Sequence, residues 1–228
     1  MPIAVAIAFA AFAGPWLAPS DLEQARDRQD RPAIEATAAK HAATAGKQPN
    51  DAQAQYRYAL AQSYMAEVAS ELRDKNAARA AAETGIQAAE KAVALQPSVA
   101  EHHRVLGTLC GQVIPANVLA GIKYGRCALD SIGKAIQLDP KSSIAYLSRG
   151  VGNYYLPSTF GGGVEKALED IEKAIQLDPK LADAYLWQGI ALRKLNRNLE
   201  ARDAFSKSLQ LRPDRIWTKQ QLDKTPAQ

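Results

Sequence analysis

Few side chains in this sequence could carry out chemistry. The three histidines are His41, His102 and His103. Two adjacent histidines on a helix point in different directions, whereas histidines that share a metal ion need to lie about one helical turn apart. We therefore interpret these residues as structural or surface histidines, and we expect neither a metal site nor a bound cofactor.

Carboxylates gather between Glu165 and Glu172, where they are interleaved with Lys166 and followed by Lys173. Glu169 and Lys173 are four residues apart, which is the spacing of an ion pair on a solvated helix face. A catalytic site needs a nucleophile, acid or base with suitable partners. The sequence offers no such set, so we predict no catalytic residues and a protein that is not an enzyme.

The stretch YYLPSTFGGG, residues 154–163, ends in three glycines that can adopt positive φ angles. A phosphate-binding loop would have a strand before the glycines and Lys-Ser or Lys-Thr after them, and Val164-Glu165-Lys166 does not supply this. Two interpretations stay open. The stretch is either a tight loop whose Phe160 packs on neighbouring helices, or the rim of a binding site formed by Tyr155, Phe160, Gly161 and Gly162.

Composition favours helices over sheet. The apolar content is 47% and relies on alanine, while aromatic residues make up only 7%. A net charge of +4 is well short of the concentrated basic surface that nucleic acids require. We expect an all-α protein that does not bind nucleic acid.

The phrase KAIQLDPK occurs twice, at residues 134–141 and 173–180. Each copy ends in Asp-Pro-Lys, and proline cannot continue a helix. Similar stops at Pro97, Pro140, Pro179 and Pro213 are spaced 43, 39 and 34 residues apart. This spacing predicts stacked helix pairs.

Several residues within these units fall at regular positions. In the last unit they are Tyr185, Gly189, Ala201, Phe205 and Pro213. Gly107, Gly150 and Gly189 each stand where two helices would cross closely, so we interpret them as packing residues. On these residues the sequence resembles the tetratricopeptide repeat family, which implies a right-handed α-solenoid of helix pairs.

The resemblance implies a division of the chain. Residues 14–50 would form an N-terminal helical cap, and residues 51–228 the repeat domain. The units would span about 54–97, 98–140, 141–179 and 180–213, with a capping helix in 214–228. The surplus residues of the early units would lie between paired helices, as insertions at 111–125 and 154–163, whereas residues 65–83 of the first unit would lengthen its helices.

Residues 111–179 carry two further resemblances. The glycine loop before a Lys-Ala helix is similar to the periplasmic T-component proteins of tripartite transporters, although this chain lacks their lipid-bearing cysteine. The stretch GIKYGRCALDSIGKAIQLDP resembles the regulators of microtubule dynamics, a divergent tetratricopeptide family. The first resemblance implies an alternative function, a small-ligand-binding accessory of a periplasmic transport system.

The first residues form an apolar run from Ile3 to Ala13. This run suits a signal-peptide core and is too short to span a bilayer, which takes about 20 residues. We expect a signal peptide in residues 1–13, no stable membrane span, and a periplasmic or secreted protein. A misassigned start codon or a short membrane-associated helix is the alternative.

Cys110 and Cys127 are the only cysteines. An exported chain would meet an oxidant that could join them, but two buried free thiols fit the sequence equally well.

The resemblance places a partner-binding groove on the first helix of each pair. Steps of four and three residues along these helices select an apolar and aromatic stripe with two arginines, which suits a peptide with hydrophobic anchors. The stripe comprises Tyr58, Gln62, Arg104, Thr108, Leu147, Val151, Tyr154, Leu186, Ile190 and Arg193. The predicted function is a non-enzymatic scaffold for a protein or peptide, with the apolar segment Val113 to Ile122 as a candidate contact for self-association.

Overall fold

The computed structural model describes residues 20–114 and 120–227, and within them all regular structure is helical. The described helices are α1 (Asp21–Asp27), α2 (Arg31–Lys47), α3 (Ala52–Glu71), α4 (Lys75–Leu95), α5 (Ala100–Val113), α6 (Ala120–Leu138), α7 (Ser143–Tyr155), α8 (Val164–Leu177), α9 (Ala182–Lys194), α10 (Asn198–Leu211) and α11 (Ile216–Asp223), with a short 3-10 helix η2 (Ser158–Phe160). The predicted signal peptide lies outside the described residues.

The repeated phrase forms the same turn twice. Both copies end a helix two residues before the proline, at Leu138 and Leu177. The carboxylates of Asp139 and Asp178 then accept a hydrogen bond from the backbone N–H two residues later, at 3.0 and 2.9 Å. These turns connect α6 to α7 and α8 to α9, as the proline stops predicted.

The helices stack as antiparallel pairs, α3 with α4, α5 with α6, α7 with α8 and α9 with α10. Each of the last three pairs crosses at a glycine. A Cβ added at Gly107 would lie 2.6 Å from Ile132, one at Gly150 would lie 2.9 Å from Ile171, and one at Gly189 would lie 2.6 Å from Phe205. The packing role predicted for these glycines is confirmed.

We expected the surplus residues of one early unit to form an insertion at residues 111–125, but the structure differs from this expectation. Here α5 continues to Val113 and α6 already starts at Ala120, so much of the stretch is helical. In the first unit the long helices expected around residues 65–83 are present as α3 and α4, which are 20 and 21 residues long. Longer helices therefore absorb most of the surplus, because they keep their backbone groups hydrogen-bonded.

Cys110 on α5 and Cys127 on α6 form a disulfide, with Cα atoms 6.0 Å apart. Cys110 is fully buried against the core of α3 to α6. The question that the sequence left open is thus answered in favour of a cross-link between the two helices of one pair.

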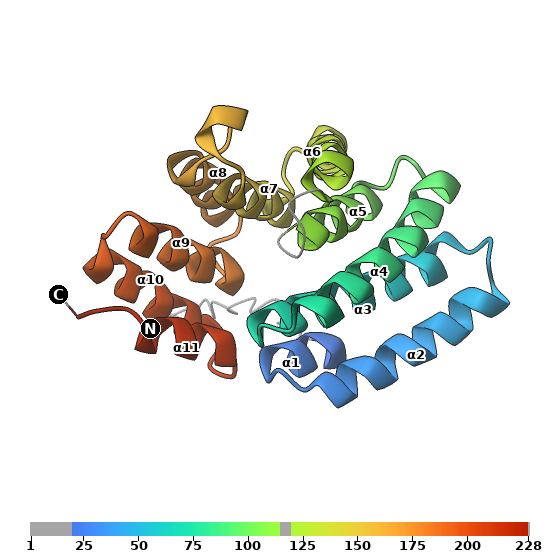
Figure 1. Cartoon of the computed structure of the whole chain (residues 1–228), viewed down its shortest axis with the longest axis horizontal. Helices are drawn as coiled ribbons and strands as arrows, with labels where there is room; N and C mark the ends of the chain where they lie inside the picture. The colour runs from blue at the N-terminus through green and yellow to red at the C-terminus, as the bar shows by residue number, and fades with distance from the viewer. Residues whose placement is uncertain (1–19, 115–119, 228) are drawn as a thin grey trace, which may run out of the picture.

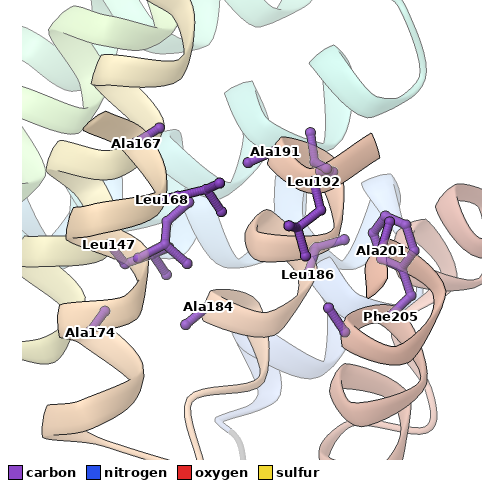
Figure 2. Close-up of a cluster of buried hydrophobic side chains, with 13 residues drawn as sticks. Leu147, Ala167, Leu168, Ala174, Ala184, Leu186, Ala191, Leu192, Ala201 and Phe205 are labelled. Atoms are coloured by element: carbon purple, nitrogen blue, oxygen red, sulfur yellow. The ribbon is translucent and has the colours of Figure 1, made fainter. Parts of the chain in front are cut away.

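Three apolar clusters follow one another along the stack. The first joins α1 to α3 and the second joins α3 to α6. The third, shown in Figure 2, joins α7 to α10 and is centred on Leu186, Ile171 and Phe205. Much of this interior is alanine, which allows the helices to pack closely.

The stack curves until its two ends meet. In Figure 1 the helices follow an arc that starts at α1 and returns to it at α11. The contact is direct: Arg28 lies 3.0 Å from Asp214, and the Gln220 amide donates to Gln29 at 3.3 Å. None of the described helices combines the length and apolar character that crossing a membrane requires.

Candidate functional site

The first helices of the pairs form the inner path of the arc. α3 contacts α5, α5 contacts α7, and α7 contacts α9. Because first helices touch one another along the stack, side chains on their free faces form a continuous surface. We call this surface the inner face.

Half of the predicted groove residues are buried rather than displayed on the inner face. They are Gln62, Arg104, Leu147, Leu186 and Ile190. Figure 2 shows Leu147 and Leu186 within the apolar cluster of α7 to α10, and Leu186 has no exposed surface. These side chains hold the helices together in the structure.

The other predicted groove residues are partly exposed. They are Tyr58, Thr108, Val151, Tyr154 and Arg193. Tyr58 packs against the cluster of α3 to α6, and Val151 and Tyr154 pack against that of α7 to α10. Arg193 donates to the Gln221 side chain at 2.6 Å and to Thr225 at 3.1 Å, so it anchors the last helix and the residues after it.

A row of aromatic rings lies on α7, α9 and α11, and we call Tyr154, Tyr155, Trp187 and Trp217 the aromatic row. Successive rings meet edge to face, with centroids 5.1 Å apart for Tyr154 and Tyr155, 5.9 Å for Tyr154 and Trp187, and 5.6 Å for Trp187 and Trp217. Tyr155 is 57% exposed, and the other three rings are partly exposed. Aromatic rings of this kind offer a large contact area at a low cost in conformational entropy.

Sequence reasoning did not include Trp187 and Trp217 among the binding residues. Trp187 adjoins Leu186, which was selected in its place, and Trp217 falls within the predicted capping helix of residues 214–228. Trp217 does pack against the cluster of α7 to α10, and it also extends the aromatic row. The recurrence of large aromatic residues on consecutive first helices is the sequence signal that could have identified the row.

A polar part of the structure lies between α3 and α5. Glu101 accepts two hydrogen bonds from Arg104, and its carboxylate also lies 3.2 Å from the Tyr56 hydroxyl. Burial raises the pKa of the Tyr56 phenol, and the nearby Glu101 carboxylate raises this pKa further. Thr108 donates to Ser148 on α7 at 3.4 Å, which links this polar part to α7.

The loop of residues 156–163 is tightly bonded to the ends of its helices. The N–H of Gly163 donates to the carbonyl of Asn153 at 2.9 Å, and the Lys166 ammonium donates to the carbonyl of Gly161 at 2.8 Å. Gly161 and Gly163 have φ angles of 83° and 115°, as the glycine run predicted. Phe160 does not pack on the stack, since it is 76% exposed, while Gly161 is exposed and Gly162 partly buried.

The histidines have structural surroundings. His102 is buried, stacks against Tyr56 and bonds the carbonyl of Ala92 at 3.1 Å, and burial lowers its pKa. His103 bonds the carbonyl of Pro97 at 2.8 Å. Among the described residues, His, Cys, Asp and Glu form no group of three that could hold a metal ion.

The candidate contact for self-association falls mainly outside the described part of the chain. Val113 is fully buried and Ile114 partly buried, and residues 115–119 are not described. Self-association through this segment stays a prediction.

Two cavities lie away from the loop of residues 156–163. One of about 20 Å³ is lined by residues of α2 to α4, and one of about 240 Å³ lies between α1 and the turn that joins α10 to α11. Neither includes a residue of the loop at 156–163.

Comparisons with known families match most of the described chain in two parts. Residues 21–159 match the family described as regulator of microtubule dynamics protein 1-3, which extends the resemblance expected from residues 111–179. Residues 182–215 match a tetratricopeptide repeat family. None of the proteins with curated functions has a significantly similar sequence.

Solved structures with the same fold include TTC0263, a thermophilic tetratricopeptide protein of Thermus thermophilus. It is 18% identical, with a TM-score of 0.62 over 87% of this chain and 98% of that protein. Another is pilF of Pseudomonas aeruginosa, also 18% identical, with a TM-score of 0.52 over 78% of this chain and 68% of that one. At these identities the likeness shows the fold alone, a helical solenoid.

Proposed function

The chain belongs to the regulator of microtubule dynamics protein 1-3 family and carries tetratricopeptide repeats, and from this premise we propose that it is a non-enzymatic scaffold that binds a protein segment on its inner face. The fold supports a role in protein interaction. The observation that carries the finer proposal is the aromatic row, because partly exposed aromatic rings on a rigid helical surface are typical anchors of protein interfaces.

The aromatic row is built to hold its shape. Tyr154, Trp187 and Trp217 each pack against the buried cluster beneath them, and each ring is held at its edge by the next. A surface that is ordered before binding loses little side-chain entropy when its partner arrives. An extended or helical segment with apolar side chains, laid across α7, α9 and α11, would suit it.

The proposal includes an oxidising compartment, either the periplasm or the outside of the cell. The disulfide between Cys110 and Cys127 supports it, since such cross-links persist where thiols are not kept reduced. The apolar run from Ile3 to Ala13, which suits a signal peptide, points the same way. Mass spectrometry of the protein from its native cells, alkylated before and after reduction, tests this: free thiols at both cysteines would contradict it.

Affinity capture from the native cell envelope tests the binding surface. The test variant is Tyr155→Ala with Trp187→Ala, and the matched control is Leu199→Ala on α10, whose side chain is 64% exposed and outside the row. A partner captured by the wild type and the control but lost by the test variant, with unchanged helix content, supports the proposal. A partner retained by the test variant would show that binding takes place elsewhere.

A further inference from the structure

Besides the exposed pair of Arg28 and Asp214, three arginines join the two ends of the stack. Arg26 on α1 lies 2.7 Å from Asp183 on α9. Two arginines make contacts in the opposite direction. Arg212 follows α10 and Arg215 precedes α11, and both contact carboxylates at the N-terminal end of the stack. Arg212 lies 2.8 Å from Asp27, and Arg215 lies 2.7 Å from Glu67. We call this contact the seam.

The centre of the seam is buried. Arg215 is only 1% exposed, and the side chains of Arg26, Asp27 and Glu71 are also buried. Arg215 donates to both oxygens of Glu71 as well as to Glu67, but its Nε atom has no hydrogen-bond partner among the described residues. Buried ion pairs depend strongly on geometry, so removal of one partner leaves an uncompensated charge.

The seam is polar, in contrast to the apolar clusters along the stack. The apolar cluster at one end draws its members from α1 to α3, and that at the other end from α7 to α11. Each central arginine is supported by a ring of its own end, Arg26 by Tyr64 at 5.3 Å and Arg215 by Trp217 at 5.6 Å. Each end therefore has its own core, and the two ends meet through charges.

The charges on the two sides of the seam, which does not include the exposed pair of Arg28 and Asp214, are complementary. The N-terminal side contributes four carboxylates and Arg26, a net charge of −3 when all are ionised, while the C-terminal side contributes Arg212, Arg215 and Asp183, a net charge of +1. The four carboxylates are Glu23, Asp27, Glu67 and Glu71. When the two ends separate, water can hydrate these charged groups. Exposing an apolar surface to water would instead cost free energy.

We infer that the seam is an ionic latch, which holds the repeat stack closed and whose release lets the two ends separate while each keeps its own fold. Closure joins residues that are more than 150 positions apart in sequence, such as Arg26 and Asp183. Opening of the latch would separate the two ends of the stack without breaking an apolar cluster. The inference concerns the shape of the chain and does not depend on the partner proposed above.

A distance measurement between the ends tests the latch. Lys75→Cys at the start of α4 and Lys219→Cys on α11 place spin labels at exposed positions on either side, and both native cysteines are held in the disulfide. In the wild-type background we expect one narrow distance distribution by pulsed electron resonance. Arg215→Met should shift this distribution to longer distances and broaden it, with helix content by circular dichroism unchanged.

Two further variants make the test decisive. Arg212→Gln removes the partly exposed arginine that pairs with Asp27 and Glu23, so it should open the seam to a lesser extent even if Arg215→Met does not fold. Arg197→Gln removes an exposed pair with Glu200 on α10, outside the seam, and should leave the distance unchanged. An unchanged distance in Arg212→Gln and in any folded Arg215→Met, or a loss of helix content in Arg212→Gln, would overturn the inference.

Discussion

Gly189 on α9 faces the ring of Phe205 on α10 so closely that a Cβ atom at Gly189 would lie 2.6 Å from the ring. Phe205 is fully buried in the cluster of α7 to α10, so its ring would have to shift within the core to admit a side chain at Gly189. The close packing of this helix pair thus relies on the absence of a side chain at Gly189.

Gly189→Ala should therefore destabilise the protein. Overpacking of a filled core typically costs about 1–3 kcal/mol, which urea unfolding would measure as a lower midpoint. Gly133→Ala on α6 is the matched control, because a Cβ there meets nothing within 4 Å. The control should gain about 0.5–1 kcal/mol, since alanine is the better helix former. Equal effects of the two substitutions would contradict the account of the crossing.

Loss of the disulfide should lower stability without changing the fold. Cys110→Ser with Cys127→Ser opens a link between residues 17 positions apart. In the chain-entropy view such a link contributes about 3 kcal/mol, and a serine hydroxyl buried at position 110 adds to the loss. The unfolding midpoint of the wild type in reductant should fall toward that of the variant. An unchanged midpoint in both would indicate that the link contributes nothing to stability.

The stability of the protein should depend on pH through two carboxylates of the seam, which act with opposite signs. Burial raises the pKa of Glu71 to about 7, against the attraction of Arg215 and with the help of Glu67. In the unfolded chain this group titrates near 4.5, so the folded state binds the extra proton between about pH 4.5 and 7. The contribution of Glu71 to stability therefore falls as the pH rises through this window.

Asp183 acts in the opposite sense at lower pH. Although burial opposes it, Arg26 and Arg215 bring the pKa of Asp183 down to about 2, below its usual 3.8. The stability that this carboxylate supplies is present above about pH 3.8 and is lost as the pH falls toward 2. Urea midpoints of wild type and Glu71→Gln from pH 4.5 to 8 separate the two groups: the variant should lose the decline toward pH 7. If the urea midpoint of the variant falls with rising pH as steeply as that of the wild type, Glu71 is not the source of the decline.

The sequence predicted the architecture because the turns are local. Asp139 and Asp178 bond a backbone N–H two residues away, so identical phrases give identical turns wherever they occur. The crossing glycines are also local signals, since a missing side chain marks a close approach. Helix pairs, their stops and their packing glycines could therefore be identified before the structure.

It was harder to predict from the sequence which face of each first helix is buried. Arg104, Leu147 and Leu186 each precede a crossing glycine by three residues, and residues three apart share a helix face. Leu147 and Leu186 consequently turn into the apolar cluster of α7 to α10, and Arg104 is buried as well. The glycines thus held the information needed to place Trp187, the residue after Leu186, on the open side.

The seam was beyond sequence reasoning for a different reason. It joins residues such as Arg26 and Asp183, whose proximity depends on the curvature added at every helix pair between them. A small change in each crossing angle would move the two ends far apart. No local pattern at Arg26 or Asp183 signals the contact.

The most direct test of the central claim measures the affinity of the captured partner for wild type and for Trp187→Ala by calorimetry, with Leu199→Ala as the control. If the aromatic row is the binding surface, loss of one central ring should weaken binding by about 2 kcal/mol or more, roughly 30-fold in Kd, while the control binds as the wild type does. Equal affinity of all three proteins, each folded, would contradict the account.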